Sequence, residues 1–451
     1  MSRRSQFQPG RQPLEHHHHH ILRHLNIGHV TGPISFLNPT RAYYDPSIHS
    51  VDSSVQDLSV TEKPSEPKPA GPLKRLWRSR DNRKGRHALV VDYESPESAK
   101  YILPQKTSTL RAAAKGIWLM VSYYPYWDVS WLVATIFTFG SVIWVINSFF
   151  EWLPLVDPST EFTNEAYIGG GVTAFIGATI FEVGSVLLLL EAVNENQAGC
   201  FGWAVETVVH QFEGKNTGSG STSTSSTKGS TNDDNIANRE DNEQSAMVET
   251  ALRHVKPAPD ECEHHHRNRR SFLKSSERIL REGLATSDSQ RTFKWLPSLE
   301  ELRTHYLHEL GFLASVIQFI GASIFWIAGL TGLPGIINHL SSGVADGVFW
   351  VPQIVGGSCF VISGLLFTIE TQPKWYIPAP RVLGWHIGTW NFIGGIGFTL
   401  CGALGPGAAN SGVAYQSSLA TFWGSWAFLV GSTIQWYESL DKHPVEEVGS
   451  T

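Results

Sequence analysis

The sequence predicts an all-α membrane protein with six transmembrane helices arranged as three hairpins. Two observations carry this prediction: six long apolar spans, and a residue pattern that repeats among them. The mean hydropathy of the 451-residue chain is −0.13, which by itself would suit a soluble protein. That average conceals a contrast, because residues 1–115 and 195–295 are polar and the rest is dense in apolar residues. Windows of about 20 apolar residues, not whole-chain means, identify membrane helices.

Each apolar span approaches the length that crosses about 30 Å of hydrocarbon at a rise of about 1.5 Å per residue. The six spans are Val129–Phe149, Gly169–Val193, Leu310–Leu330, Val348–Ile369, Leu383–Leu404 and Ser418–Tyr437. Trp and Tyr gather at their ends, as in Tyr123–Trp127 and Trp375–Tyr376. These aromatic residues favour the headgroup region of a bilayer, which supports the assignment.

The distribution of Lys and Arg predicts that both termini are cytoplasmic. The connections 151–165, 332–347 and 405–415 contain neither residue. The opposite side carries the basic N-terminal flank, the long loop between the second and third spans, and Lys374 with Arg381. Positively charged loops remain on the cytoplasmic side of a membrane.

The apolar spans and the polar segments between them divide the chain into seven predicted regions. They are a disordered region at 1–70, a basic cytoplasmic region with an interfacial segment at 71–122, hairpin 1 at 123–195, a cytoplasmic linker with a basic amphipathic segment at 196–295, hairpin 2 at 296–372, hairpin 3 at 373–441 and a C-terminal tail at 442–451. The run His16–His20 fits either an expression tag or native low complexity.

Two basic segments are expected to contact partners on the cytoplasmic side. Residues 74–86 carry seven Lys and Arg against Asp81 alone. Such a run either binds anionic inner-leaflet lipids or nucleic acid, or forms a solvated, positive-inside flank, which is the favoured interpretation. Residues 267–284 interleave basic and apolar residues, as in a helix that lies on a membrane or binds a cytoplasmic protein. The Ser/Thr-rich linker at 214–232 offers hydroxyls for phosphorylation. A nucleic-acid partner is not expected.

One pattern occurs in the second, fourth and sixth spans. A small residue is followed by phenylalanine after four positions, a second small residue after seven and glutamate after fourteen. The residues are Gly177, Phe181, Gly184 and Glu191; Gly356, Phe360, Ser363 and Glu370; and Gly424, Phe428, Gly431 and Glu438. The odd-numbered spans align at Trp131, Gly140 and Trp144; at Phe312, Gly321 and Phe325; and at Trp385, Gly394 and Phe398. Three hairpins of equal orientation imply a pseudo-threefold axis along the membrane normal, with a central passage or a solid core.

The spacing of the pattern has a physical meaning. Residues seven apart on a helix lie on nearly the same face, two turns along. Small residues there let helix backbones approach closely, which is how membrane helices gain packing energy. The repeated glycines, Ser363 and the phenylalanines beside them are therefore predicted to form helix contacts.

The residues Gly424–Ser432 read GSWAFLVGS, and Phe139–Ser141 read FGS in an odd span. This resembles the YrhK-like domain, a two-helix membrane module whose second helix reads G-[ST]-W-x-F-x-x-G-S. The resemblance covers the three hairpins, well under half of the chain, and the linkers resemble those of fungal multi-pass membrane proteins. It implies a fold and assigns no activity. Pro352 and Gly357 alter the pattern in the second hairpin, and the three glutamates stand where small bacterial members are expected to have a basic residue.

Four polar residues within or beside the spans are candidates for a functional pathway. Glu182 lies in mid-span, where an ionisable group is costly unless it is paired or solvated. The alternative is a protonated Glu182 bonded to a helix bearing Gln318 or Asn391. Those two amides occupy equivalent positions, where Phe137 stands in the first span, and either join helices or line a pore. His386, near the inner interface, either titrates near neutral pH or is structural.

Glu191, Glu370 and Glu438 are predicted to form a ring of three carboxylates at the cytoplasmic mouth. Negative charge is unfavourable at a helix C-terminus, so compensation is expected from Lys374, Arg381, Lys442 or a bound cation. The ring is either a cation-attracting vestibule or a set of ordinary boundary charges.

The sequence predicts no catalytic residues, cofactor or metal site. It contains no P-loop, HExxH, GxSxG or dinucleotide fingerprint. Glu301, His305 and His308 share a helical face beside Glu309, and Cys262 precedes His264–His266, but neither group has a recognised metal spacing. The first hypothesis is a non-enzymatic scaffold or regulatory unit of the membrane. The alternative is a small-ion or proton pathway along the pseudo-threefold axis.

Overall fold

The computed structural model describes residues 31–44, 73–85, 88–91, 101–102, 109–195, 198, 201, 205, 254–255, 293–440 and 446–447. The segments 214–232 and 267–284, the run His16–His20 and Cys262 with its histidines lie outside the described residues, as does most of the region 1–70 that was predicted to be disordered.

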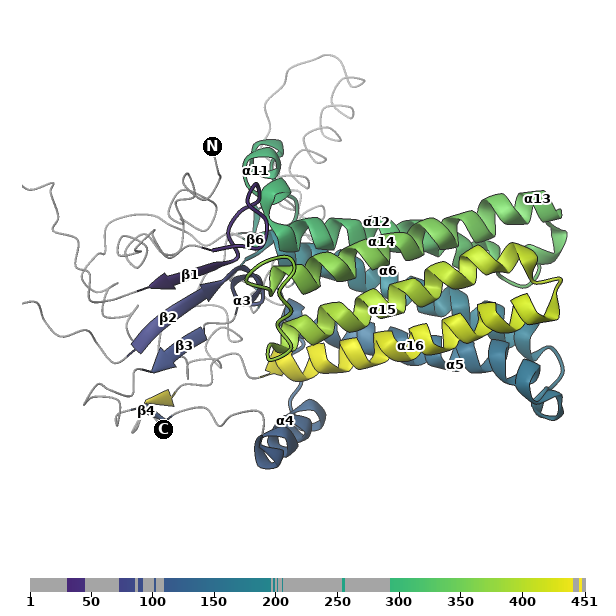
Figure 1. Cartoon of the computed structure of the whole chain (residues 1–451), viewed down its shortest axis with the longest axis horizontal. Helices are drawn as coiled ribbons and strands as arrows, with labels where there is room; N and C mark the ends of the chain where they lie inside the picture. Colours follow the sequence, from purple (N-terminus) through teal and green to yellow (C-terminus); the bar gives the residue numbers. More distant parts are fainter. Residues whose placement is uncertain are drawn as a thin grey trace, which may run out of the picture.

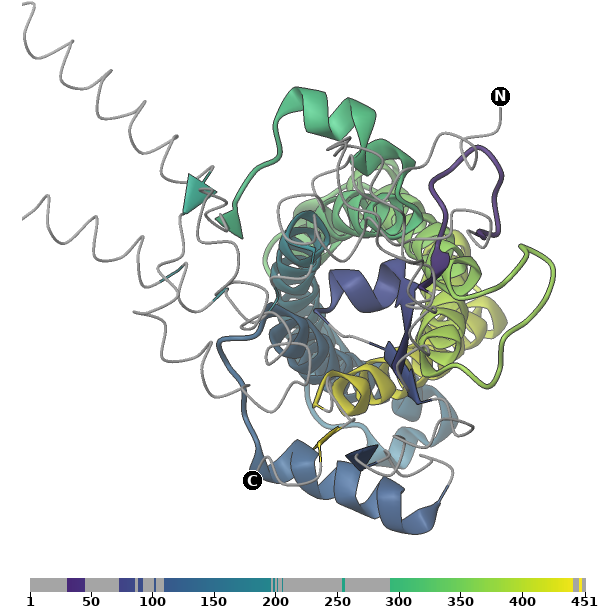
Figure 2. The same cartoon turned by 90° about the vertical axis from the view of Figure 1, so that its left-hand side faces the viewer.

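Six long helices form one bundle (Figure 1). They are α5 (Val129–Val156), α6 (Gly171–Val193), α12 (Leu310–Thr331), α14 (Val351–Glu370), α15 (Leu383–Leu404) and α16 (Ser411–Leu440). Each helix packs against the next in this order, and α16 packs against α5, which closes the bundle into a ring around a central axis. Figure 2 shows this ring end on.

Five of these helices are long and apolar enough to cross a membrane. The exception is α16, which is 30 residues long but carries several Ser, Thr and Gln side chains. The five apolar helices fit a membrane-embedded, multi-pass protein, and the predicted spans agree with the helices to within a few residues at most ends. A sixth membrane crossing by α16 stays a prediction.

The bundle has two different ends. At one end, here called the loop end, short elements join the long helices: η3 (Pro158–Thr160), η4 (Glu165–Gly170), η7 (Ile337–His339), α13 (Ser342–Ala345), η8 (Asp346–Trp350) and η9 (Gly405–Gly407). At the other end lie α3 (Ser79–Arg83), α4 (Leu110–Ser122), α11 (Leu299–Thr304) and η6 (Tyr306–His308). Ser298 and Glu301 form the capping box that the sequence predicts at the start of α11.

A small antiparallel sheet stands beyond the second end. Its order is β1 (Arg41–Tyr44), β2 (Leu73–Arg78) and β3 (Ala88–Val91), and β2 and β3 form a hairpin whose tip contains α3. Gly85 ends the tip with a φ of 66°, a left-handed conformation that favours glycine. Residues 31–44 are structured, which the prediction of a disordered N-terminal region did not anticipate. Two short pairs complete the strands: β4 (Tyr101–Ile102) with β7 (Glu446–Glu447), and β5 (His254–Val255) with β6 (Phe293–Lys294).

The repeated aromatic residues meet inside the ring of helices. One side chain from each long helix enters a single buried cluster, here called the aromatic cluster: Trp144, Phe181, Phe325, Phe360, Phe398 and Phe428. Ring centroids in the cluster lie 4.8 Å apart for Trp144 and Phe398 and 5.5 Å apart for Phe181 and Phe428. Because all six helices contribute, the cluster fills the axis of the bundle at this level.

Glycines of the predicted pattern lie where neighbouring helices touch: α5 with α6, α12 with α14, and α15 with α16. A Cβ on Gly140 would meet Phe181 of α6 at 2.8 Å, and a Cβ on Gly394 would meet Phe428 of α16 at 2.8 Å. A Cβ on Gly356 would meet the carbonyl oxygen of Gly321 at 2.7 Å. At the position of the second small residue, the hydroxyl of Ser363 donates to the carbonyl of Ala314 on α12 at 2.8 Å. These positions therefore leave little room for a larger side chain.

Candidate functional site

The tip of the β2–β3 hairpin lies across the α3 end of the bundle, at the centre of the ring (Figure 2). We call residues 79–84 the plug and this end of the bundle the plugged end. Arg80, Arg83 and Lys84 are spaced so that one helical turn presents all three toward the same side. Each of the three is at least 94% buried. Such burial of three cations requires partners of opposite charge.

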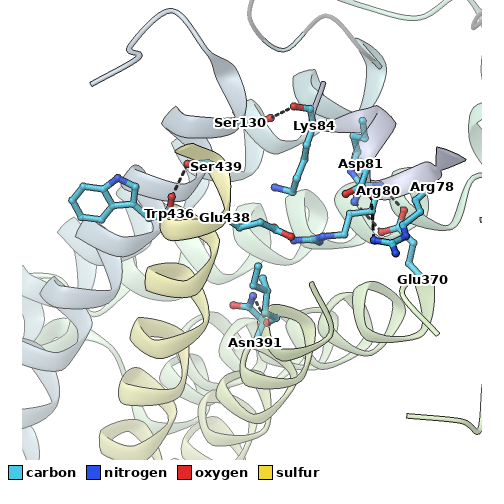
Figure 3. Close-up of polar contacts among 12 residues, drawn as sticks. Arg78, Arg80, Asp81, Lys84, Ser130, Glu370, Asn391, Trp436, Glu438 and Ser439 are labelled. Carbon is cyan, nitrogen blue, oxygen red and sulfur yellow. Dashed lines mark hydrogen bonds and ion pairs between the residues drawn. The ribbon is translucent and has the colours of Figure 1, made fainter. Parts of the chain in front are cut away.

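The three predicted ring carboxylates provide those partners, one for each cation. Arg80 pairs with Glu438 of α16 at 2.6 Å. Arg83 pairs with Glu370 of α14 at 2.7 Å. Lys84 Nζ lies 3.5 Å from Glu191 Oε1 of α6. Figure 3 shows Arg80 and Lys84 extending from the plug toward the helix ends.

The pair formed by Arg83 and Glu370 has the most complete geometry. Two guanidinium nitrogens donate to the two carboxylate oxygens at 2.7 and 2.9 Å, and the hydroxyl of Ser79 donates to Glu370 Oε1 at 2.9 Å. Paired hydrogen bonds of this kind fix orientation as well as charge. The plug is therefore held in one defined position on α14.

Small residues at the starts of three helices make room for the plug. They occupy equivalent positions, directly before the aligned aromatic residues Trp131, Phe312 and Trp385: Ser130, Gly311 and Gly384. A Cβ on Gly311 would overlap the guanidinium of Arg83, and a Cβ on Gly384 would meet Arg80 Nε at 2.5 Å. Ser130 keeps a hydroxyl, which donates to Glu191 Oε1 at 2.8 Å.

Burial and the ion pairs act in opposite directions on the plug cations. Burial opposes the charge of Arg83, but Glu370 outweighs it and raises the pKa of Arg83. The same balance, with Glu438 as the partner, raises the pKa of Arg80. For Lys84, burial prevails over the attraction of Glu191 and lowers the pKa. Both guanidinium groups therefore remain charged in the plugged bundle.

Of the compensating charges predicted for the carboxylate ring, Lys374 and Arg381 do not pair with it, and the plug cations take that role. Lys374 lies over the ring of Tyr376 at 5.8 Å, Arg381 is exposed, and Lys442 is outside the described residues. The solvated flank predicted for residues 74–86 was also wrong for Arg80, Arg83 and Lys84, which are buried. A signal was present in the sequence, since three cations on one helical turn match three carboxylates in number.

A cavity of about 40 Å³ lies between the plug and the aromatic cluster. Side chains from the plug and from all six long helices line it: Arg80, Arg83, Lys84, Phe137, Ser141, Phe181, Leu188, Glu191, Gln318, Phe367, Ile387, Asn391, Phe428, Ser432 and Gln435. We call it the central cavity. It brings together two of the predicted polar residues, Gln318 and Asn391, with Phe137 at the equivalent position.

Sequence reasoning missed Gln435, which is 7% exposed and lines the same cavity. Its equivalents in the other even helices are Leu188 and Phe367, which also line it. The sequence did contain a signal for Gln435, since an amide stands there where the other two equivalent positions are apolar. The cavity wall is therefore polar mainly on the side of α12, α15 and α16.

The other two predicted pathway residues lie away from the central cavity. Glu182 sits between α6 and α12, where its Oε1 accepts a hydrogen bond of 2.9 Å from Ser323. This contact agrees with the interhelical alternative for Glu182, because Ser323 lies on α12, the helix that bears Gln318. His386 Nε2 donates to the carbonyl of Pro380 at 2.7 Å, in the connection that precedes α15.

The acidic and histidine residues before α12 do not converge on one point. Glu301 bonds to Lys294, His305 lies 3.7 Å from Glu195, and Glu309 accepts a bond of 2.6 Å from Asn38. Within the described ranges, no three His, Cys, Asp or Glu residues are placed to hold a metal ion. This group instead ties residues 31–44 and the end of α6 to the start of α12.

Comparisons of the chain with protein-family models, with curated proteins and with solved structures give no match, so the argument for function rests on the geometry of the plug, the carboxylate ring and the central cavity.

Proposed function

We propose that the chain is a non-enzymatic, regulatory membrane unit that holds its own N-terminal hairpin in the mouth of a six-helix bundle. In this proposal all six long helices cross the membrane, the three hairpins are copies of a YrhK-like module, and the plugged end faces the cytoplasm. The observation that carries it is the match of three plug cations with three carboxylates on equivalent positions of α6, α14 and α16. Release and return of the hairpin would change which cytoplasmic surface a partner protein meets.

Two further features support a closed unit. The aromatic cluster fills the bundle axis beneath the central cavity, and the plug covers the cavity at the other end. Both closures are built from this chain's own residues. A permanently open pathway does not fit this arrangement, whereas a scaffold that stores a releasable segment does.

The rate of cleavage by trypsin reports the release of the plug, because trypsin cleaves after Arg80, Arg83 and Lys84. The test compares wild-type protein in lipid vesicles with the triple variant Glu191→Gln, Glu370→Gln and Glu438→Gln, which removes all three partners and keeps the cleavage sites. We expect cleavage within the plug about tenfold or more faster in the variant, because local opening exposes these bonds. Glu182→Gln, which changes an intramembrane carboxylate that bonds to Ser323, is the matched control and should leave the rate unchanged.

Equal cleavage of wild type and triple variant, with both shown to be folded, would reject a releasable plug. The expected regulatory role also requires that a partner responds to the released state. Binding of cytoplasmic proteins should therefore differ between the triple variant and Glu182→Gln.

The central cavity favours a second candidate, a small-ion pathway that the plug keeps closed. Its polar wall lies on the axis, where a conducting path would run. Ion flux into vesicles separates the two candidates: the scaffold predicts none for either protein, and the gated pathway predicts flux in the triple variant alone. Deleting residues 200–290 should abolish a scaffold function and leave such a flux intact.

A further inference from the structure

The charged groups that face the central cavity are mostly positive. Arg80, Arg83, Lys84 and Glu191 are the charged residues among those that line it, whereas Glu370 and Glu438 do not face it. Both oxygens of Glu370 are already occupied by Arg83. The three positive charges of the plug equal the three negative charges of the carboxylate ring in number. Only one of those carboxylates faces the cavity, so the cavity wall carries three cations against one carboxylate.

Lys84 has hydrogen-bonding capacity that its neighbours do not use. An ammonium group has three donors, and for this one the facing acceptor in the described part of the chain is Glu191 Oε1 at 3.5 Å, an ion pair longer than a good hydrogen bond. The residue is 3% exposed. A buried ammonium whose three donors share one distant acceptor is unfavourable, so a further acceptor inside the cavity would stabilise it.

Two amide side chains point to the same conclusion independently. Gln318 is 9% exposed and Gln435 is 7% exposed, both line the cavity, and neither side chain forms a hydrogen bond within the described residues. Asn391 also lines the cavity, and its amide nitrogen donates to the carbonyl of Ile387 at 2.9 Å, which fixes its orientation. Amide N–H groups of Gln318 and Gln435 are thus free to donate to an occupant.

We propose that the central cavity binds one small monovalent inorganic anion, of the size of a halide or nitrate, together with water. The excess of cations on its wall selects an anion, and Lys84, Gln318 and Gln435 supply the donors. The volume of about 40 Å³ holds on the order of three water-sized spheres, which suits a small anion with water. The site belongs to the plugged state, and it stands whether or not release of the plug regulates a partner.

The experiment measures the thermal midpoint of the full-length protein in detergent, at constant ionic strength, as sodium gluconate is replaced by sodium chloride, bromide or nitrate. We expect the midpoint to rise and saturate with each of the three small anions. Sulfate, a larger dianion, should not produce the saturable rise. Bromide binding, measured by isothermal titration calorimetry, should be half-maximal at the bromide concentration that produces half of the rise in the thermal midpoint.

Gln435→Leu is the informative variant, because its equivalent, Leu188, is already apolar and the plug cations keep their partners. This variant should need an anion concentration about tenfold or more higher for half of the stabilising effect, as expected when a hydrogen bond to a charged group is lost. Trypsin resistance of the plug should stay as in wild type. Glu182→Gln, outside the cavity, should bind anion as wild type does.

Three outcomes would overturn the proposal. The first is the same thermal midpoint in gluconate and in the small anions for folded wild-type protein, which would mean that the cavity holds water alone. The second is an anion effect that Gln435→Leu leaves unchanged, which would place the effect elsewhere on the molecule. The third is an equal effect of sulfate, which would indicate general salt stabilisation.

Discussion

Arg83 and Glu370 are joined by two hydrogen bonds of 2.7 and 2.9 Å, although 287 positions separate them in the chain. Arg83 is 4% exposed and Glu370 is 2% exposed. The pair holds the tip of the β2–β3 hairpin against the end of α14. Replacement of either residue alone should therefore destabilise the protein more than replacement of both.

Removal of Glu370 alone is expected to destabilise the protein strongly. Glu370→Gln leaves the buried guanidinium of Arg83 without a counter-charge, which typically costs about 3–5 kcal/mol. The double variant Arg83→Met with Glu370→Leu removes both charges and should recover much of that loss. Denaturant unfolding in detergent measures both free energies. A double variant no more stable than Glu370→Gln would contradict this account.

The glycine that faces Arg83 is expected to be needed for closure of the plug. A Cβ on Gly311 would overlap the guanidinium of Arg83 and lie 2.6 Å from Glu370 Oε1. Gly311→Val should therefore displace Arg83 and make the plug sensitive to trypsin. Gly343→Val is the matched control, because a Cβ there meets nothing within 4 Å. Equal resistance of the two variants would show that the guanidinium can move aside at no cost.

The aromatic cluster is expected to contribute a large share of the stability of the bundle. Phe181 is 4% exposed and contacts the rings of Phe137, Trp144, Phe360 and Phe428. Phe181→Ala should cost about 3–5 kcal/mol, since it leaves an unfilled space in a packed core. Phe139→Ala, whose side chain is 60% exposed on α5, should cost far less. Comparable losses for the two variants in thermal unfolding would mean that the cluster is not the core of the bundle.

The helices were predictable because apolar length and period are local properties of the sequence. The helix α15 begins and ends at the predicted residues, Leu383 and Leu404. The helix α16 begins at Ser411, seven residues before the predicted Ser418. A hydropathy window detects the part of a helix that suits hydrocarbon, whereas backbone hydrogen bonds continue into polar residues.

Of the candidate site, the sequence predicted the three carboxylates but not the cations that pair with them. Glu191, Glu370 and Glu438 were identified because they occupy equivalent positions in three spans. Their partners lie on a short turn more than 100 residues before Glu191, and pairing over such distances depends on tertiary structure. Gln435 was missed for a different reason: one amide among Ser and Thr residues does not stand out until its equivalents, Leu188 and Phe367, are compared with it.

The helix α4 offers a prediction about the membrane surface. Its side chains Ile117, Trp118 and Val121 are 59%, 68% and 57% exposed, and Lys115 lies on the same short helix. Exposed apolar residues of this kind on an amphipathic helix fit the headgroup region of a bilayer. A fluorophore attached to Cys at Ile117→Cys should be quenched by lipids with brominated acyl chains, and one at Lys115→Cys should be quenched much less. Equal quenching at the two positions would exclude a helix that lies in the interface with one face inward.

The cluster before α12 predicts a dependence of stability on pH. Burial raises the pKa of Glu309 from 4.5 to about 7, against the opposing effect of His305. Burial lowers the pKa of His305, but Glu195 outweighs it and the net shift is upward. In both groups the folded protein holds its proton more tightly than the unfolded chain does. Their stabilising contribution is therefore complete at low pH and is lost as the pH rises through the folded values.

The thermal midpoint should accordingly fall as the pH rises from about 5 to about 8, because in this interval the folded protein binds more protons than the unfolded chain does. Glu309→Gln keeps an uncharged side chain of the same shape beside Asn38, so it should flatten most of this dependence. Glu300→Gln, an exposed change on α11, should retain the wild-type profile. A profile that Glu309→Gln does not alter would assign the pH dependence to other groups. A midpoint that rises with pH over this interval would mean that Glu309 is stabilised as the carboxylate, with His305 as its charged partner.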